Sequence, residues 1–194
     1  MFSDEVSFEL ADTSAMNRSF VHRTQTEKYS SACILDNPVQ SRQRVMVWGC
    51  ITRTGPGPFC IVRGGITSDT YQRVLNDNLL PFLGDLPLSK RVNTIFQQDN
   101  APPHRARATR DFLQQAAIPV TDWPPLSPDL NPIENVWALL KRRIRKIRPQ
   151  TIRELETAIL DSWSAVVTRK LCKRLFLSMP DRISKVIKLR GLRP

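Results

Sequence analysis

The order of apolar segments in this 194-residue sequence predicts a mixed α/β domain. Short apolar runs of strand length occur through the first two-thirds of the chain, whereas the last third carries apolar residues at helical spacing. One helical segment separates the early strands from the later ones. Strands that precede helices, with a single helix between strands, are typical of a mixed α/β fold rather than of a regular βαβ array.

Five segments have the length and composition of β-strands. The run 45–51 (VMVWGCI) is almost continuously apolar, and the turn cluster 52–57 (TRTGPG) joins it to a further apolar run. Residues 45–63 are therefore a predicted hairpin. The remaining predicted strands are 5–10, 92–96 and 118–120.

Helical spacing marks the other elements. Ser68 is suited to an N-cap, and apolar residues recur at helical spacing from there to Phe82. The clearest helix follows the proline-rich loop 122–132 and ends before Pro149, and the capping box Thr151-x-x-Glu154 begins the next. The predicted helices after residue 100 are 103–116, 133–147, 151–166, 168–177 and 180–189.

The charge distribution favours a polyanionic partner such as nucleic acid. From Lys141 onward there are 16 basic and 4 acidic residues, a net charge of +12, whereas residues 1–140 carry a net charge of −1. A solvated basic face or a nuclear-import signal is the alternative. No apolar run approaches the ~20 residues of a membrane helix, so neither a membrane partner nor secretion is expected. The sequence also lacks a C-x-x-C zinc motif and a P-loop.

Three carboxylates are candidates for metal-dependent chemistry. Asp4 begins the first strand, Asp99 follows an apolar strand, and Glu134 lies in the first turn of a helix. Converging carboxylates suit Mg²⁺ or Mn²⁺, and two such ions support in-line attack on a phosphodiester. Each has a structural alternative: a terminal surface charge for Asp4, a turn for Asp99, and a capping box with Asn131 for Glu134. His104 is expected to face solvent or to cap its helix.

Taken together, several segments resemble the catalytic domain of Tc/mariner transposases. The resemblance implies a ribonuclease H-like fold with a mixed five-stranded sheet, flanking helices and basic C-terminal helices. It also implies a D,D,E triad on Asp4, Asp99 and Glu134, with 34 residues between the last two. The segments are SDEVSFEL (3–10), VMVWGCI (45–51), QQDNAPPH (97–104), WPPLSPDLNPIENVW (123–137) and RISKVIKLRG (182–191).

The resemblance further implies cut-and-paste movement of DNA. Two Mg²⁺ or Mn²⁺ ions would support hydrolysis at the transposon end and transfer of the freed 3′-OH to a TA target, in the nucleus and by a homodimer. The expected organisation is a catalytic core over 1–149, with a clamp-like insertion at 18–44, and a basic helical extension over 150–194. The residues expected to bind DNA phosphates are Lys141, Arg142, Arg143, Arg145, Lys146 and Arg148.

The sequence also departs from the family pattern. No helix-turn-helix pair precedes the core, and Asp4 lies so near the first residue that its strand is expected to fray. In the clamp-like region, Val21-His22-Arg23 replaces a Val-Trp-Arg, and residues 41–44 replace a glycine-rich run. The alternative interpretation is therefore a truncated, catalytically inactive or host-adopted remnant that acts as a non-specific DNA-binding or interaction module.

Overall fold

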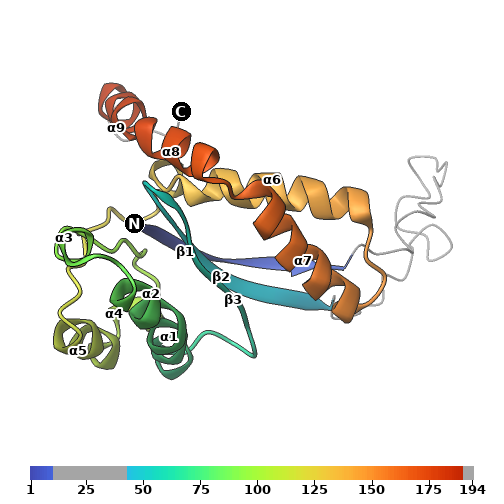
Figure 1. Cartoon of the computed structure of the whole chain (residues 1–194), viewed down its shortest axis with the longest axis horizontal. Coiled ribbons are helices and arrows are strands. Elements are labelled where there is room, and N and C mark those ends of the chain that lie inside the picture. The colour runs from blue at the N-terminus through green and yellow to red at the C-terminus, as the bar shows by residue number, and fades with distance from the viewer. Residues whose placement is uncertain (11–42, 190–194) are drawn as a thin grey trace, which may run out of the picture.

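The computed structural model describes residues 1–10 and 43–189, which contain a three-stranded antiparallel sheet (Figure 1). Its strands are β1 (Phe2–Glu9), β2 (Arg44–Thr52) and β3 (Gly55–Val62), in that spatial order. The hairpin of β2 and β3 confirms the prediction for residues 45–63. The predicted clamp-like insertion lies outside the described residues, apart from its last two positions.

Among residues 1–10 and 43–189, the sheet continues beyond β1 only as two isolated parallel bridges. Phe2 pairs with Gln97, and Phe96 pairs with Val120. The mixed α/β class is confirmed, but the described residues contain three strands and two bridges instead of five full strands. The bridges stand where the strands 92–96 and 118–120 were predicted.

Local hydrogen bonds explain why the segment before Phe96 is not a strand. The chain forms the short helix α3 (Leu88–Arg91), and two polar side chains that follow it bind its carbonyl groups. Asn93 Nδ2 donates to the Ser89 carbonyl at 2.7 Å, and Thr94 Oγ1 donates to the Lys90 carbonyl at 2.8 Å. Such side chains compete with a sheet for the backbone.

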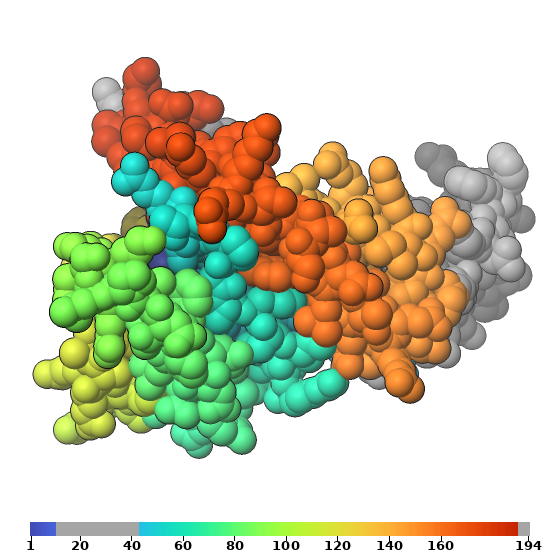
Figure 2. All heavy atoms as spheres, viewed as in Figure 1, coloured from blue at the N-terminus to red at the C-terminus, as the bar shows by residue number. Residues whose placement is uncertain are grey.

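Helices cover both faces of the sheet (Figure 1). In the space-filling view, α6 to α9 form one orange-to-red mass beside a green lobe that contains α1 and α2 (Figure 2). One face packs against α1 (Ser68–Val74), η4 (Leu75–Leu79), α2 (Leu80–Gly84) and α5 (Arg107–Gln115), and the other against α6 (Ile133–Ile147), α7 (Ile152–Val166) and α8 (Arg169–Leu177). The remaining helical segments are α4 (Pro102–Arg105), η5 (Pro128–Leu130) and α9 (Met179–Lys188).

Several helix boundaries differ from their predictions. Thr67, not Ser68, caps α1, because its side chain accepts from the backbone N–H of Thr70. The predicted helix 103–116 is divided at Ala106, whose extended backbone separates α4 from α5. Thr151 caps α7 as predicted, because its Oγ1 accepts from the Glu154 N–H at 3.1 Å, but the box is not closed on Thr151: the Glu154 carboxylate accepts from the Gln150 N–H at 2.8 Å.

Alternation along β2 divides the apolar core into two clusters. Trp48 and Cys50 face the α1 side, whereas Val45 and Val47 face the α6 side. The α6-side cluster also takes in buried residues of α7 and α8, so these helices share a core with the strands.

Gly49 allows an aromatic cluster to approach the sheet closely. A Cβ at this position would lie 2.8 Å from Phe59 Cδ2 and 3.0 Å from Trp137 Cη2. Trp163 stacks on Phe59 with ring centroids 4.2 Å apart.

Among the described residues, no helix has both the length and the apolar character needed to cross a lipid bilayer.

Candidate active site

The three carboxylates selected from the sequence line one pocket of about 490 Å³. Asp4 reaches it from β1, Asp99 from the loop that follows the bridge residues Phe96 and Gln97, and Glu134 from the first turn of α6. The proline-rich loop 123–128 forms another part of the lining, which is completed by Asn100, Ala101, Arg105 and Asn131. Its Trp123 packs edge-on against Phe2 of β1, with ring centroids 6.0 Å apart.

Asp4 lies on a strand that is bonded along both edges. On one side Asp4 is opposite Gly49 of β2. On the other side the Ser3 N–H and Ser3 Oγ donate to the Gln97 carbonyl at 3.2 and 2.8 Å, and the Gln97 N–H donates to the Met1 carbonyl at 3.0 Å. The expectation that this strand would fray is therefore wrong, because Gln97 secures it from the side opposite β2.

The carboxylate of Asp4 is largely withdrawn from water and lies near two other negative charges. Burial, followed by the charges of Glu5 and Glu134, raises its pKa to about 7. The indole Nε1–H of Trp137 donates to Asp4 Oδ2 at 3.0 Å and opposes this rise. A cation in the pocket would favour the ionised form of Asp4.

Asp99 is held in place by His104. His104 Nδ1 donates to Asp99 Oδ1 at 2.6 Å, and the Ala101 N–H donates to the same oxygen at 2.9 Å. The bond from His104 lowers the pKa of Asp99, so this carboxyl is ionised at neutral pH. Both bonds engage Oδ1, and Oδ2 is left for a ligand in the pocket.

The imidazole of His104 is buried, with 3% of the residue exposed, so the expectation that it faces solvent is wrong. Its Nε2 lies 3.3 Å from Glu5 Oε1, and its ring lies on Tyr71 with centroids 4.0 Å apart. Burial lowers the pKa of His104, but the bonds to Asp99 and Glu5 outweigh it and raise the pKa to about 9. A protonated His104 therefore bridges two carboxylates on the α1 side of β1.

Glu134 is positioned by the turn that precedes α6. The Glu134 N–H donates to the Asn131 carbonyl at 3.2 Å. Asn131 is buried; its Oδ1 accepts from the Ile133 N–H at 3.3 Å, and its Nδ2 donates to the Ser3 carbonyl at 3.1 Å. Within the described residues no hydrogen bond reaches the Glu134 carboxylate, so the capping-box alternative has no support from its side chain.

The donor set of the pocket suits a divalent cation. Carboxylate oxygens are the ligands that Mg²⁺ and Mn²⁺ prefer, and the raised pKa of Asp4 reflects its burial and, after that, the negative charges of Glu5 and Glu134. In the part of the chain that the structure describes, however, no three His, Cys, Asp or Glu side chains lie close enough to hold one ion. The three carboxylates therefore line the same pocket but do not lie close enough to one another to hold a single ion.

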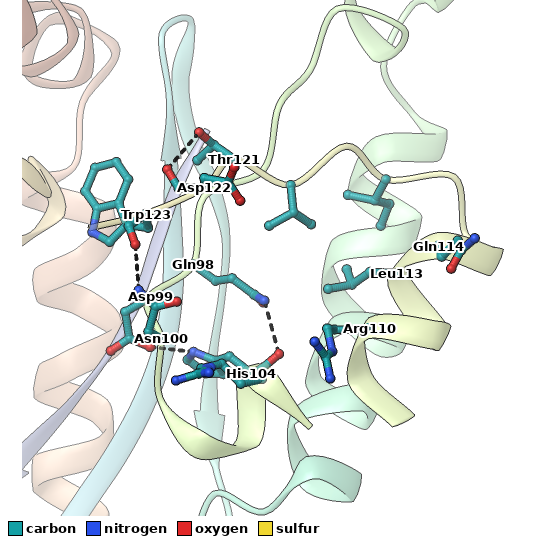
Figure 3. A pocket seen from close by; sticks show the side chains of 13 residues that line it. Gln98, Asp99, Asn100, His104, Arg110, Leu113, Gln114, Thr121, Asp122 and Trp123 are labelled. Atoms are coloured by element: carbon teal, nitrogen blue, oxygen red, sulfur yellow. Dashed lines mark hydrogen bonds and ion pairs between the residues drawn. The ribbon is translucent and has the colours of Figure 1, made fainter. Parts of the chain in front are cut away.

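A second cavity of about 490 Å³ adjoins the first across Asp99 and Trp123 (Figure 3). Asn100 Nδ2 donates to the Trp123 carbonyl at 2.6 Å and connects the two walls. Figure 3 shows His104 beside Asp99 at one end of this cavity and Arg110 of α5 on its far wall.

The six basic residues predicted to contact DNA lie in and just after the second half of α6. At 1.5 Å per residue they lie about 10–21 Å along the helix from Glu134. All six are exposed and Ile144, between them, is buried, so the charged side chains face away from the core. Within the described residues none of the six forms an ion pair. They are Lys141, Arg142, Arg143, Arg145, Lys146 and, at the left-handed C-cap, Arg148.

The sequence interpretation missed the residues that hold the carboxylates. His104 is separated from Asp99 by one short turn, and its place in QDNAPPH was the available signal. Trp137 was assigned to the apolar stripe of its helix, which it does join, but its indole also faces Asp4. A Trp one turn after Glu134 is the only hint of that contact in the sequence.

A family model described as "DDE superfamily endonuclease" matches residues 1–156. The chain belongs to this family. Over 150 residues this DDE domain is 39% identical to the Tc3 transposase of Caenorhabditis elegans, a match that covers 76% of this chain and 44% of that protein. It is 31% identical to the Tc1 transposase of the same organism, over 98% of this chain and 68% of that protein. The chain is thus a transposase catalytic domain of the Tc/mariner type, and the matched part spans less than half of Tc3.

Solved structures show the same fold. The Mos1 transposase catalytic domain with Raltegravir and Mg matches with a TM-score of 0.70 and 23% identity, over 78% of this chain and 77% of that one. The mariner Mos1 paired end complex with Mg matches with a TM-score of 0.75 and 21% identity, over 99% of this chain and 55% of that one. The predicted ribonuclease H-like fold is confirmed by this likeness.

Proposed function

We propose that this DDE domain cleaves and joins DNA at transposon ends in a reaction that depends on Mg²⁺ or Mn²⁺, with Asp4, Asp99 and Glu134 as the metal ligands. One observation carries the proposal: these three residues, from three separate elements, line a single pocket. The spacing of the last two is that of the D,D,E triad.

The protein side chains in this proposal orient the ligand oxygens. His104 and the Ala101 N–H bind Asp99 Oδ1, and no hydrogen bond from the described residues engages Oδ2. Trp137 holds Asp4 Oδ2, and the turn at Asn131 sets the direction of Glu134. Two bound divalent ions would activate the attacking oxygen and stabilise the leaving oxygen at the phosphodiester.

The substrate proposed here is DNA, first at a transposon end and then at a TA target. Water attacks the phosphodiester in the first step and releases a 3′-OH, which attacks a target phosphodiester in the second. The basic residues of α6 would bind phosphates of the same DNA outside the pocket. Mos1 forms a paired end complex, which supports DNA ends as partners and a homodimer as the working unit. Such a substrate also favours a nuclear location.

The test combines Mn²⁺ titration calorimetry with nicking of supercoiled DNA. Glu134→Gln is the sharpest variant, because no hydrogen bond from the described residues depends on that carboxylate. Asp99→Asn and Asp4→Asn complete the set. Asp161→Asn is the control, since Asp161 is exposed on α7 and does not line the pocket.

The expected result is Mn²⁺ binding and Mn²⁺-dependent nicking that Asp161→Asn retains and Glu134→Gln loses. Loss of both properties in Asp99→Asn, with thermal unfolding still cooperative, would identify Asp99 as a second metal ligand. A folded parent that neither binds Mn²⁺ nor nicks DNA would overturn the proposal. Nicking that survives in Glu134→Gln would overturn the assignment of the ligands. The inactive-remnant interpretation has no support from this pocket, where all three carboxylates are present.

A further inference from the structure

The side chain of Arg182 hydrogen-bonds α9 to the segment that carries Glu134. None of the described α9 residues is buried, and the helix contacts η5 and α8. Figure 1 shows α8 and α9 near the beginning of α6. The apolar side chains Ile183 and Ile187 are 46% and 69% exposed, so apolar burial contributes little to holding this helix in place.

The guanidinium of Arg182 makes three directed hydrogen bonds. Nη1 donates to the Asp129 carbonyl of η5 at 2.8 Å, and Nη2 donates to Asn135 Oδ1 of α6. Nε donates to Ser178 Oγ at 3.0 Å, and that hydroxyl in turn donates to the Leu175 carbonyl at 2.7 Å. The guanidinium of Arg182 is thus engaged by hydrogen bonds within the protein.

The acceptors of the bonds from Nη1 and Nη2 lie on either side of Glu134 in the sequence. Asp129 precedes Glu134 by five residues, and Asn135 follows it directly. A planar guanidinium presents its N–H groups in a fixed fork, so it holds two acceptors at a set distance from each other. A lysine keeps the charge but places a single ammonium group, and it cannot reproduce both bonds.

We propose that Arg182 is a positioning residue for the active site: it fixes both flanks of Glu134 and so sets where that carboxylate lies in the pocket. Asn131 also anchors this segment, through its bond to the Ser3 carbonyl of β1. Glu134 therefore lies on a segment with one anchor on β1 and one on α9. The inference rests on the proposed function only in taking Glu134 as a metal ligand.

The test compares Arg182→Lys with Arg174→Lys in the full chain. Arg174 is exposed on α8 and its side chain is not hydrogen-bonded to a described residue, so its replacement controls for exchanging arginine for lysine in the same region. Three properties are measured: amide hydrogen exchange of residues 127–136 without metal, Mn²⁺ affinity by calorimetry, and thermal unfolding.

In Arg182→Lys we expect faster amide exchange over 127–136 and Mn²⁺ binding weakened roughly tenfold, the effect typical of removing a residue that supports a metal ligand. Arg174→Lys should match the parent in both. Asn135→Ala should weaken Mn²⁺ binding as well, and the double variant should show a smaller effect than the product of the two single effects, because both act through one bond.

Unchanged exchange and unchanged Mn²⁺ affinity in Arg182→Lys would overturn the inference. A lower unfolding temperature with unchanged Mn²⁺ affinity would also overturn it, because Arg182 would then only attach α9. If the parent itself fails to bind Mn²⁺, the proposed function fails. The exchange of 127–136 still decides whether Arg182 holds this segment.

Discussion

The indole Nε1–H of Trp137 donates to Asp4 Oδ2 at 3.0 Å and connects α6 to β1. Trp137 lies three residues after Glu134, on the next turn of the same helix. Two of the proposed metal ligands are therefore coupled through one side chain. Its ring also packs against Trp163 and Phe59, so core packing orients a group that touches the site.

Replacing Trp137 with Phe should weaken metal binding more than it weakens folding. The variant keeps an aromatic ring but removes the donor that opposes the rise in the pKa of Asp4. We expect lower Mn²⁺ affinity by calorimetry and a decrease of about 1.5–3 kcal/mol in unfolding free energy, the range for a hydrogen bond to a charged group. Trp163→Phe is the control, because Trp163 belongs to the same cluster without contacting a carboxylate. Equal Mn²⁺ affinity in the two variants would contradict this prediction.

Replacing Gly49 with Ala should destabilise the domain. The added Cβ would meet Phe59 Cδ2 at 2.8 Å and Trp137 Cη2 at 3.0 Å, so aromatic rings must shift. The expected cost is about 1–3 kcal/mol in unfolding free energy, measured by chemical denaturation. Gly84→Ala is the comparison, because nothing lies within 4 Å of a Cβ there. A cost that is the same at both positions would show that the aromatic cluster yields freely.

The metal-free protein should become less stable above neutral pH through His104. Its pKa is about 9 in the folded chain and 6.5 ordinarily, so its contribution is complete below pH 6.5 and disappears as the pH rises through 9. The charged and titratable groups facing it are Asp99, Glu5 and Tyr71. We expect the unfolding free energy to fall by on the order of 2–3 kcal/mol across this range.

His104→Gln provides the comparison for this pH effect. The amide keeps a donor but does not titrate, so denaturation midpoints measured from below the ordinary pKa to above the folded one should fall less steeply than those of the parent. Parallel curves for the two proteins would mean that His104 is not the group responsible.

Removing the basic residues of α6 should reduce the salt dependence of DNA binding. Replacing Lys141, Arg142 and Arg145 with Gln should lower the slope of log K against log salt by about 0.9 for each DNA phosphate that the variant no longer neutralises. Fluorescence anisotropy at several salt concentrations measures the slope. The control replaces Lys185 and Lys188, two exposed cations of α9. If the slope changes only in the control, the surface that binds DNA lies on α9 and not on α6.

Long periodic segments were predictable because their pattern and their tertiary packing agree. The helices from Ile133 to Leu177 bury the stripes that the sequence shows, and the hairpin from Arg44 to Val62 follows from two apolar runs around a turn. The prediction of a strand over 92–96 failed because polar side chains of this segment bind carbonyl groups of the preceding helix. The hydrophobic pattern of a sequence does not reveal such contacts.

The candidate site was predictable only at its three carboxylates. Asp99 and Glu134 stand in recognisable motifs, and the structure brings both to one pocket with Asp4. The supporting groups come from distant parts of the chain. Arg182 lies 47 residues from its acceptor Asn135, and Asn131 lies 128 residues from Ser3. No local pattern encodes such pairs, because they arise when separate elements pack.

Two neighbouring acids on β1 point to opposite sides of the sheet: Asp4 contacts Trp137 of α6, and Glu5 lies against His104 of α4. Because side chains alternate along a strand, a slip of one residue would exchange them. Glu5 would then enter the pocket and Asp4 would approach the imidazole of His104. The pocket would keep the same charge, but the carboxylate from β1 would stand on a longer side chain and so in a different place. Which of the two acids enters the pocket therefore depends on strand alignment, which the bonds of Ser3 to Gln97 and Asn131 enforce.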